Sequence, residues 1–280
     1  MRRTGAGNGA AVCAVLALGL ALAAAGARAA VRVELRAAEV GAEAKKPFKY
    51  VIWIDGSRLA AELKRRDGSP AQRRIVFRAD EDRAWLVDLA RKTYYQVDPQ
   101  AAQQVAGQVA GLRKGLESGL ESLTPEQREA ARELLGELAK PPSKPPGEVS
   151  LRERGEVARY ADTPCARHDV LEGARRLAEV CLADYGRAPL TREAVAAVPA
   201  LGGFLRRTLE PLTREFPTLQ ELAPFAVLDR VDGFPLAVQS FENGAPTRET
   251  VVTKIEQAPA DPALFELPTG FARSWIPPFR

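Results

Sequence analysis

RRIVFRADEDRAWLVDLARKTYYQVD, residues 73–98, contains three short runs of β-branched, aromatic and other apolar residues. The runs occupy residues 73–80, 83–89 and 92–98, and the acidic turn Asp80-Glu81-Asp82 and the dipeptide Ala90-Arg91 separate them. Short strands divided by turns at intervals of about 8–12 residues are typical of an antiparallel meander. We therefore predict three antiparallel strands in this stretch.

The residues before this meander are also β-like, and they are apolar on both sides. VRVELRAAEV (31–40) alternates apolar and polar residues, and RRDGSP (65–70) is a turn signal. In PFKYVIWIDG (47–56), Val51 and Trp53 point to one side of the strand, and the opposite side carries Phe48, Tyr50, Ile52 and Ile54. A sheet that is apolar on both faces is covered on both, or it wraps around something.

A helical pattern replaces the β pattern after Asp98-Pro99. Apolar residues then recur at spacings of three and four, which marks one helix face; they are Val105, Val109, Leu112, Leu116, Leu120 and Leu123. A second helix is expected to begin at Thr124, because Thr124 suits the N-cap, Pro125 suits the first helical position and Gln127 completes a capping box. The proline-rich stretch KPPSKPPGE (140–148) reads as a stiff linker.

The second half of the chain repeats the order of strands, helix and strands. VSLRERGEVARYA (149–161) and a cysteine-containing hairpin come first, and residues 189–217 are helical. Pro199, Gly202-Gly203 and Pro211 are expected to break or kink that helix, which favours a movable lid over a rigid core helix. A final meander turns at Asp232-Gly233 and Asn243-Gly244, and an extended tail, ADPALFELPTGF, follows it.

The first thirty residues have the pattern of a secretory signal peptide. Arg2 and Arg3 precede an apolar run from Ala10 to about Gly26, and Ala27-Arg28-Ala29 forms a small-x-small cleavage site. A membrane-spanning helix is the alternative, but a run of about 17 residues is at the lower edge of the spanning range. We expect residues 1–29 to be cleaved and the mature protein to be periplasmic or extracellular.

Net charge argues against a nucleic-acid partner. Cleavage after Ala29 would remove three arginines and no acidic residue, so the Lys+Arg count would fall from 40 to 37 against 36 Asp+Glu. A nearly neutral mature chain lacks the clustered basic surface that nucleic acids require.

Cys165 and Cys181 lie at equal distances from Gly173 in the sequence. A hairpin that turns at residues 172–174 would place them directly opposite each other, with Cα atoms about 4.5 Å apart at a non-hydrogen-bonded position. In an oxidising compartment we expect such a pair to form a disulfide, worth roughly 3 kcal/mol in the chain-entropy model. A bulge at Arg175 or Arg176 would shift the register by one residue and prevent this pairing.

A zinc site is the alternative for the same segment, with Cys165, His168, Cys181 and Asp184 as ligands. Residues i and i+3 on a strand point to opposite faces, so Cys165 and His168 are poorly placed to share one ion. A Cys-x-x-Cys redox motif is absent. We therefore expect a structural disulfide, no metal, and an ordinary strand position for His168.

The sequence offers little for catalysis. His168 is the single histidine, so any Ser-His-Asp or Cys-His arrangement would have to include it. Phosphate-binding loops, the HExxH zinc motif and calcium loops are all missing. We expect a protein that is not an enzyme and has no cofactor.

Four stretches resemble an uncharacterised family of secreted bacterial domains near the lipoprotein-carrier (LolA/LolB-like) superfamily. They are RIVFRADEDRAWLVDLARKTYYQVD, the TPCARHDV…AEVCLAD hairpin, DGFPLAVQSFENG and LFELPTGF. The resemblance implies an α+β fold: a curved antiparallel sheet, forming an open half-barrel, with helical insertions at about 98–140 and 189–217 that cover its concave face. Residues 30–280 would form one such domain. In the carriers, the cavity of the half-barrel shelters acyl chains.

We therefore expect a monomeric, non-catalytic binding protein for a lipid, a lipoprotein or another apolar small molecule, with transient contact with a membrane. The residues expected to line its cavity are Trp53, Phe77 and Trp85 on strands and Val109, Leu112, Phe204, Leu205 and Leu209 on helices. The alternative is an envelope interaction module with a filled core, because stripes of Leu and Val at helical spacing more often form core than a ligand site. A hydrolase or redox enzyme is a third reading and would need His168 or a free thiol.

Overall fold

The computed structural model describes residues 28–41, 47–64, 71–135, 148–213 and 227–274. Four expectations lie wholly or mostly outside these ranges. They are the signal peptide up to residue 27, the turn at 65–70, the linker at 140–148 and the end of the helix expected at 189–217.

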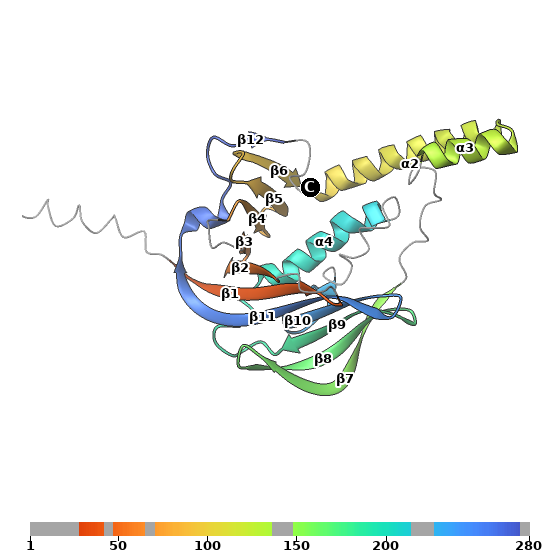
Figure 1. The fold of residues 1–280 in the computed structure, drawn as a ribbon. Coiled ribbons are helices and arrows are strands. Elements are labelled where there is room, and N and C mark those ends of the chain that lie inside the picture. The colour runs from red at the N-terminus through yellow and green to blue at the C-terminus, as the bar shows by residue number, and fades with distance from the viewer. Residues whose placement is uncertain (1–27, 42–46, 65–70, 136–147, 214–226, 275–280) are drawn as a thin grey trace, which may run out of the picture.

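A single twelve-stranded sheet organises the described residues, in the order β12-β6-β5-β4-β3-β2-β1-β11-β10-β9-β8-β7. The strands are β1 (Arg28–Glu39), β2 (Phe48–Asp55), β3 (Arg58–Lys64), β4 (Arg73–Arg78), β5 (Arg83–Asp88), β6 (Thr93–Val97), β7 (Val149–Tyr160), β8 (Thr163–Glu172), β9 (Arg175–Ala183), β10 (Phe234–Glu242), β11 (Ala245–Ala260) and β12 (Ala272–Arg273). Neighbouring strands are antiparallel except for β12 and β6. The sheet is open, and Figure 1 shows it curving from β6 to β7.

The meander predicted from residues 73–98 is present as β4, β5 and β6. Strand β3 was not predicted, because its sequence RLAAELK consists largely of residues that favour helices. Pairing with β2 on one side and β4 on the other overrides that local preference.

Alternation along β1–β5 gives the sheet two apolar faces. Directly paired residues share a face, and one such row runs across Val31, Ile54, Leu59, Phe77 and Ala84. The neighbouring row, on the opposite face, runs across Trp53, Ala60, Val76 and Trp85. We call these the Phe77 face and the Trp85 face. Both rows are almost entirely buried, apart from the half-buried Trp53, so the sheet is covered on both sides, as predicted.

The C-terminal tail covers the Trp85 face. The short helix η3 (Pro262–Phe265) places Phe265 against Ala30 and Ala60, and the residues after it pack on Val76 and Trp85 through Leu267 and Phe271. Strand β12 then pairs with β6 (Figure 1). A bidentate ion pair holds the tail to the sheet, with Arg78 donating to both carboxylate oxygens of Glu266 at 2.8 and 2.7 Å.

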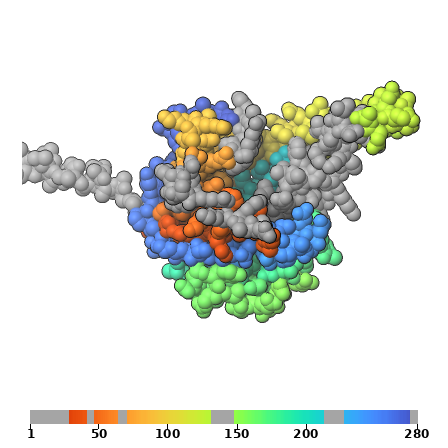
Figure 2. All heavy atoms as spheres, in the orientation of Figure 1, coloured from red at the N-terminus to blue at the C-terminus, as the bar shows by residue number. Residues whose placement is uncertain are grey.

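Helix α4 (Ala197–Thr213) packs against the Phe77 face. The Phe204 ring lies 5.2 Å from the Phe77 ring, and each of the two residues is 1% exposed. The backbone N–H of Ala197 donates to the carbonyl of Gly56 at 2.7 Å, which ties the start of the helix to the β2–β3 turn. In Figure 2 the cyan atoms of α4 lie in a recess beside the orange strands.

The helix expected at 189–217 begins only at Ala197, after turns at 192–196, and the expected break within it is wrong. α4 continues through Gly202-Gly203 and Pro211, and Gly202 has a packing role instead. A Cβ added there would lie 2.5 Å from the backbone nitrogen of Asp229 and 2.8 Å from the Leu228 Cβ. Gly202 therefore allows the chain at 228–229 to approach the helix closely.

The other two α-helices of the described chain are α2 (Pro99–Glu121) and α3 (Pro125–Leu135). The predicted capping box of α3 is confirmed: the Thr124 N–H donates to Gln127 Oε1 at 3.1 Å, and the Gln127 N–H donates to Thr124 Oγ1 at 3.3 Å. Helix α2 packs on α4, and Figure 1 shows α2 and α3 extending away from the sheet.

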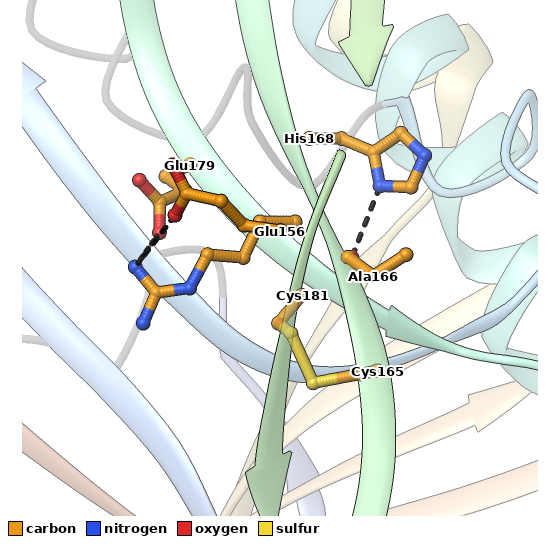
Figure 3. The surroundings of a disulfide bond; sticks show 7 residues. Glu156, Cys165, Ala166, His168, Glu179 and Cys181 are labelled. Carbon is orange, nitrogen blue, oxygen red and sulfur yellow. Dashed lines mark hydrogen bonds and ion pairs between the residues drawn. A yellow bond between two sulfur atoms is a disulfide. The ribbon is translucent and has the colours of Figure 1, made fainter. Parts of the chain in front are cut away.

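The disulfide between Cys165 and Cys181 is present, with the two Cα atoms 5.3 Å apart and each residue 3% exposed. The predicted register of its hairpin is wrong, however, because Arg167 and not Cys165 lies opposite Cys181. A two-residue turn and a bulge after Val170 each shift the pairing by one residue. Since side chains alternate along a strand, the combined shift of two residues returns both cysteines to the same face (Figure 3).

We predict that Gly202→Ala lowers the free energy of unfolding by about 1–3 kcal/mol, because the new methyl group overpacks the contact with residues 228–229. Urea denaturation measures this change. Gly107→Ala on α2 is the matched control, since a Cβ there meets nothing within 4 Å, and it should stabilise by roughly 0.5–1 kcal/mol. Equal effects of the two substitutions would contradict the close packing at Gly202.

Candidate functional site

One group of accessible apolar side chains in the described chain lies on the Phe77 face, beside the buried row. We call it the open row: Ile52, Ala61, Ile75, Leu86 and Tyr95, which are directly paired across β2–β6. The first four of these residues lie two positions from a residue of the buried row, and Tyr95 is directly paired with Leu86, so both rows share one face. Strand alternation alone therefore brings the five side chains together.

Exposure changes sharply between the two rows. Phe77 is 1% exposed beneath α4, whereas Ile75, two residues earlier on the same face of β4, is 39% exposed. The other members of the open row are half-buried, and Phe48 near the same end of β2 is 43% exposed. The cover that α4 provides thus ends between Phe77 and Ile75, whereas Ile52 and Ala61 still pack against the edge of the core.

The strand residues expected to line a cavity do not share one lining. Phe77 belongs to the core under α4, but Trp53 and Trp85 lie on the opposite face, where the C-terminal tail packs against them. The expectation that all three point inward is wrong for the two tryptophans. Direct pairing of Phe77 with Ala84 places Trp85 on the other side of the sheet.

The expected helix residues also separate. On α4, Phe204 and Leu209 are buried and Leu205 is half-buried. On α2, Val109 is half-buried and Leu112 is 64% exposed. The residues that α2 buries are Ala102, Ala106, Arg113 and Leu120. Leu120 is thus the buried member of the larger apolar stripe, whereas Val105 and Leu112 of that stripe are exposed.

The open row itself was not predicted as a site, although its signal was in the sequence. Residues two apart on a strand share a face, so Ile75 lies on the face of Phe77. The turn at 79–82 pairs Phe77 with Ala84, and it therefore also pairs Ile75 with Leu86. Exposure under an incomplete helical cover is a tertiary property, and no local pattern reports it.

Charged groups near the sheet form structural ion pairs. The Asp80 carboxylate accepts from Arg78, which lowers the pKa of Asp80. Burial disfavours the charged form of Asp169, but the hydrogen bond from Arg152 and the charge of Arg176 outweigh it and hold the pKa of Asp169 below its ordinary value. These arrangements explain the shifts without an acid–base role.

The cysteine segment offers no nucleophile, because both sulfurs are in the disulfide. The imidazole of His168 contacts the Ala166 carbonyl through Nδ1 at 3.1 Å and points away from the bridge (Figure 3). Among the residues that the structure describes, no group of three or more His, Cys, Asp or Glu side chains could hold a metal ion. The candidate site is the apolar surface of the open row.

A scan against protein-family models finds no match, and a search of curated proteins finds none either. A search of solved structures finds MucB, with a TM-score of 0.36 and 12% identity over 94% of this chain. It also finds the complex of MucA and MucB from Pseudomonas aeruginosa, with a TM-score of 0.36 and 14% identity over 87% of this chain. The chain spans 57–66% of the length of these matched chains.

The same search finds LolA superfamily protein NE2245 from Nitrosomonas europaea. This match has a TM-score of 0.32 and 6% identity, and it covers 86% of this chain and 91% of that one. At these scores no family, ligand or residue role is carried over to this chain. None of the helices in the described part of the chain has both the length and the hydropathy that a membrane crossing needs.

We predict that alanine substitution on β4 is much less destabilising at Ile75 than at Phe77. Phe77→Ala should lower the free energy of unfolding by about 3–5 kcal/mol, because it leaves a cavity beneath α4. Ile75→Ala should cost less than about 1 kcal/mol, because much of that side chain is already hydrated. Urea denaturation of both variants gives the comparison, and a cost at Ile75 equal to that at Phe77 would show that the open row is covered.

Proposed function

We propose that this chain is an exported, non-catalytic binding protein that holds an apolar ligand, such as the acyl chain of a lipid or lipoprotein, on the open row. The observation that carries the proposal is the abrupt rise in exposure from Phe77 to Ile75 on one face of one strand. A strip of apolar side chains left accessible beside a packed core is a surface that gains free energy when an apolar ligand covers it.

In this proposal the Phe77 face is the concave face of a half-barrel, and α4 fills its deep part. The ligand lies beside α4 and not under it, because the packing at Gly202 opposes movement of the helix. The open row crosses five strands, and four spacings of about 4.8 Å give a strip roughly 19 Å wide. Each methylene buried there would contribute about 0.8 kcal/mol.

The location of the protein is part of the same proposal. Cleavage after Ala29 would leave Ala30 as the first residue, and Ala30 is 1% exposed within β1, opposite Ala258 of β11. The mature chain would then work as a monomer in the periplasm or outside the cell and touch a membrane only transiently. Its partners would be a lipid, a lipoprotein or another apolar small molecule.

A second candidate is an envelope interaction module, and the exposed side of α2 favours it. Leu112 is 64% exposed and Val105 is 42% exposed on a helix that extends away from the sheet (Figure 1). In this reading the fixed helix α4 completes an ordinary core, and a partner protein would cover α2. The two candidates differ in which apolar surface the natural ligand covers.

We predict that purified residues 30–280 bind a fluorescent long-chain fatty acid and that Ile75→Asp weakens the binding by roughly tenfold or more, since one buried isoleucine contributes about 1.5–3 kcal/mol. Fluorescence titration measures the affinity, and native mass spectrometry of the wild-type protein should detect a co-purified lipid. Leu112→Asp is the control, because it changes an exposed apolar residue outside the open row. Failure of the wild-type protein to bind, or equal loss in both variants, would contradict the proposal.

A further inference from the structure

Strand β7 forms one end of the sheet, and it is a free edge. It pairs with β8 on one side, and in the described part of the chain no strand pairs with its other side. An unpaired strand edge presents backbone N–H and C=O groups that another extended chain can use.

The two halves of this edge differ. Pairing with β8 passes from Glu153 opposite His168 to Val157 opposite Ala166, so three residues, 154–156, bulge where β8 has one. Gly155 adopts a φ of 71° there, and the charged residues on either side of it pair with each other at 2.9 Å. Bulges and charges are the usual protection of a strand edge against pairing. The first half of β7 is thus blocked.

The second half, Val157–Tyr160, has no bulge, and its one charged residue is the exposed Arg159, on the same face as Val157. This half pairs regularly with Thr163–Ala166 of β8, and Val157 is 76% exposed, the highest value among the exposed large apolar residues of the described chain. A regular edge that carries an exposed valine is suited to pairing with an added strand.

A hollow of about 140 Å³ lies next to this half of the edge. Its floor is a directly paired row, Val157–Ala166–Leu182, and Pro164, Asp184 and Arg187 line its sides. Cys165 also lines the hollow, and its disulfide with Cys181 links β8 to β9, two of the three strands that form the floor. A cavity of about 150 Å³ accommodates a benzene molecule, so this hollow is large enough for one aliphatic side chain or small ring.

We propose that an extended peptide segment of a partner protein adds to the sheet as a strand along Val157–Tyr160 and inserts one aliphatic side chain into the hollow. In strand addition the backbone hydrogen bonds supply affinity, and a pocket for an alternate side chain supplies specificity. The apolar floor favours an aliphatic group, and because Asp184 and Arg187 line the sides, charged peptides test this selectivity directly.

A second copy of this chain fits the site less well. Antiparallel pairing of two copies along Val157–Tyr160 would place Tyr160 of one copy opposite Val157 of the other. Tyr160 is half-buried against the protein's own core, so it is not free to fill the hollow. The bulge at 154–156 would also end the shared ladder after about four residues.

The test uses residues 30–280 and synthetic peptides in which threonine alternates with one variable residue: Val, Leu, Asp or Lys. The valine or leucine peptide should bind, and it should slow hydrogen exchange at the amides of 157–160; the aspartate and lysine peptides should not. Val157→Lys and Ala166→Leu, which respectively charge the edge and fill the hollow, should each weaken binding by roughly tenfold or more. Val40→Lys, at an exposed apolar position directly after β1, is the control and should bind as wild type does.

Three results would overturn the proposal: no peptide binds, the charged peptides bind as well as the aliphatic ones, or the protein alone forms a dimer that Val157→Lys abolishes. Thermal unfolding establishes that each variant folds. The site is independent of the open row, so Ile75→Asp should leave peptide binding unchanged. Failure of peptide binding and failure of fatty-acid binding are therefore distinguishable.

Discussion

A sheet that is apolar on both faces must be covered on both, and the rest of this structure follows from that constraint. The chain meets it with two different elements. Helix α4 covers the Phe77 face, and the C-terminal tail covers the Trp85 face through η3, Leu267 and Phe271. The first element is held by the close approach at Gly202, and the second by the ion pair between Arg78 and Glu266. Helix α4 and the C-terminal tail, which are distant in sequence, thus pack on opposite faces of the same part of the sheet.

The two covers differ in extent, and the difference produces the candidate site. The tail follows the Trp85 face as far as β6, where β12 extends the sheet. The cover of α4 stops after one row, so Ile75 remains accessible while Phe77 does not. Binding at the open row therefore requires no opening of the core. The disulfide acts at the other end of the sheet, where it fixes β8 against β9 beneath the free edge of β7.

Much of the fold could be predicted from the sequence, because alternation and turn residues are local signals. They gave the strands of the first meander, the hairpin of β10 and β11, the N-cap of α3 and the disulfide. The strand expected before Asp232-Gly233 is absent, because the described residues 227–230 form a turn. The disulfide was right although its register was wrong, since a slip of two residues preserves the face of each cysteine. Strand β3 was missed because RLAAELK favours a helix in isolation, and without β3 nothing in the sequence linked Trp53 to the face of Trp85. Gly202 was interpreted as a helix breaker, because the chain that packs on it is 26 residues away.

The central claim is that α4 is a fixed part of the core and that the accessible apolar surface lies beside it. Native-state hydrogen exchange of the backbone amides of α4, compared with those of β2–β4 and α3, tests this most directly. If the claim is correct, the amides around Phe204 exchange as slowly as those of the central strands, because only global unfolding exposes them. Exchange of α4 at the rate of α3, well before the strands, would show that α4 opens as a lid and would contradict the claim.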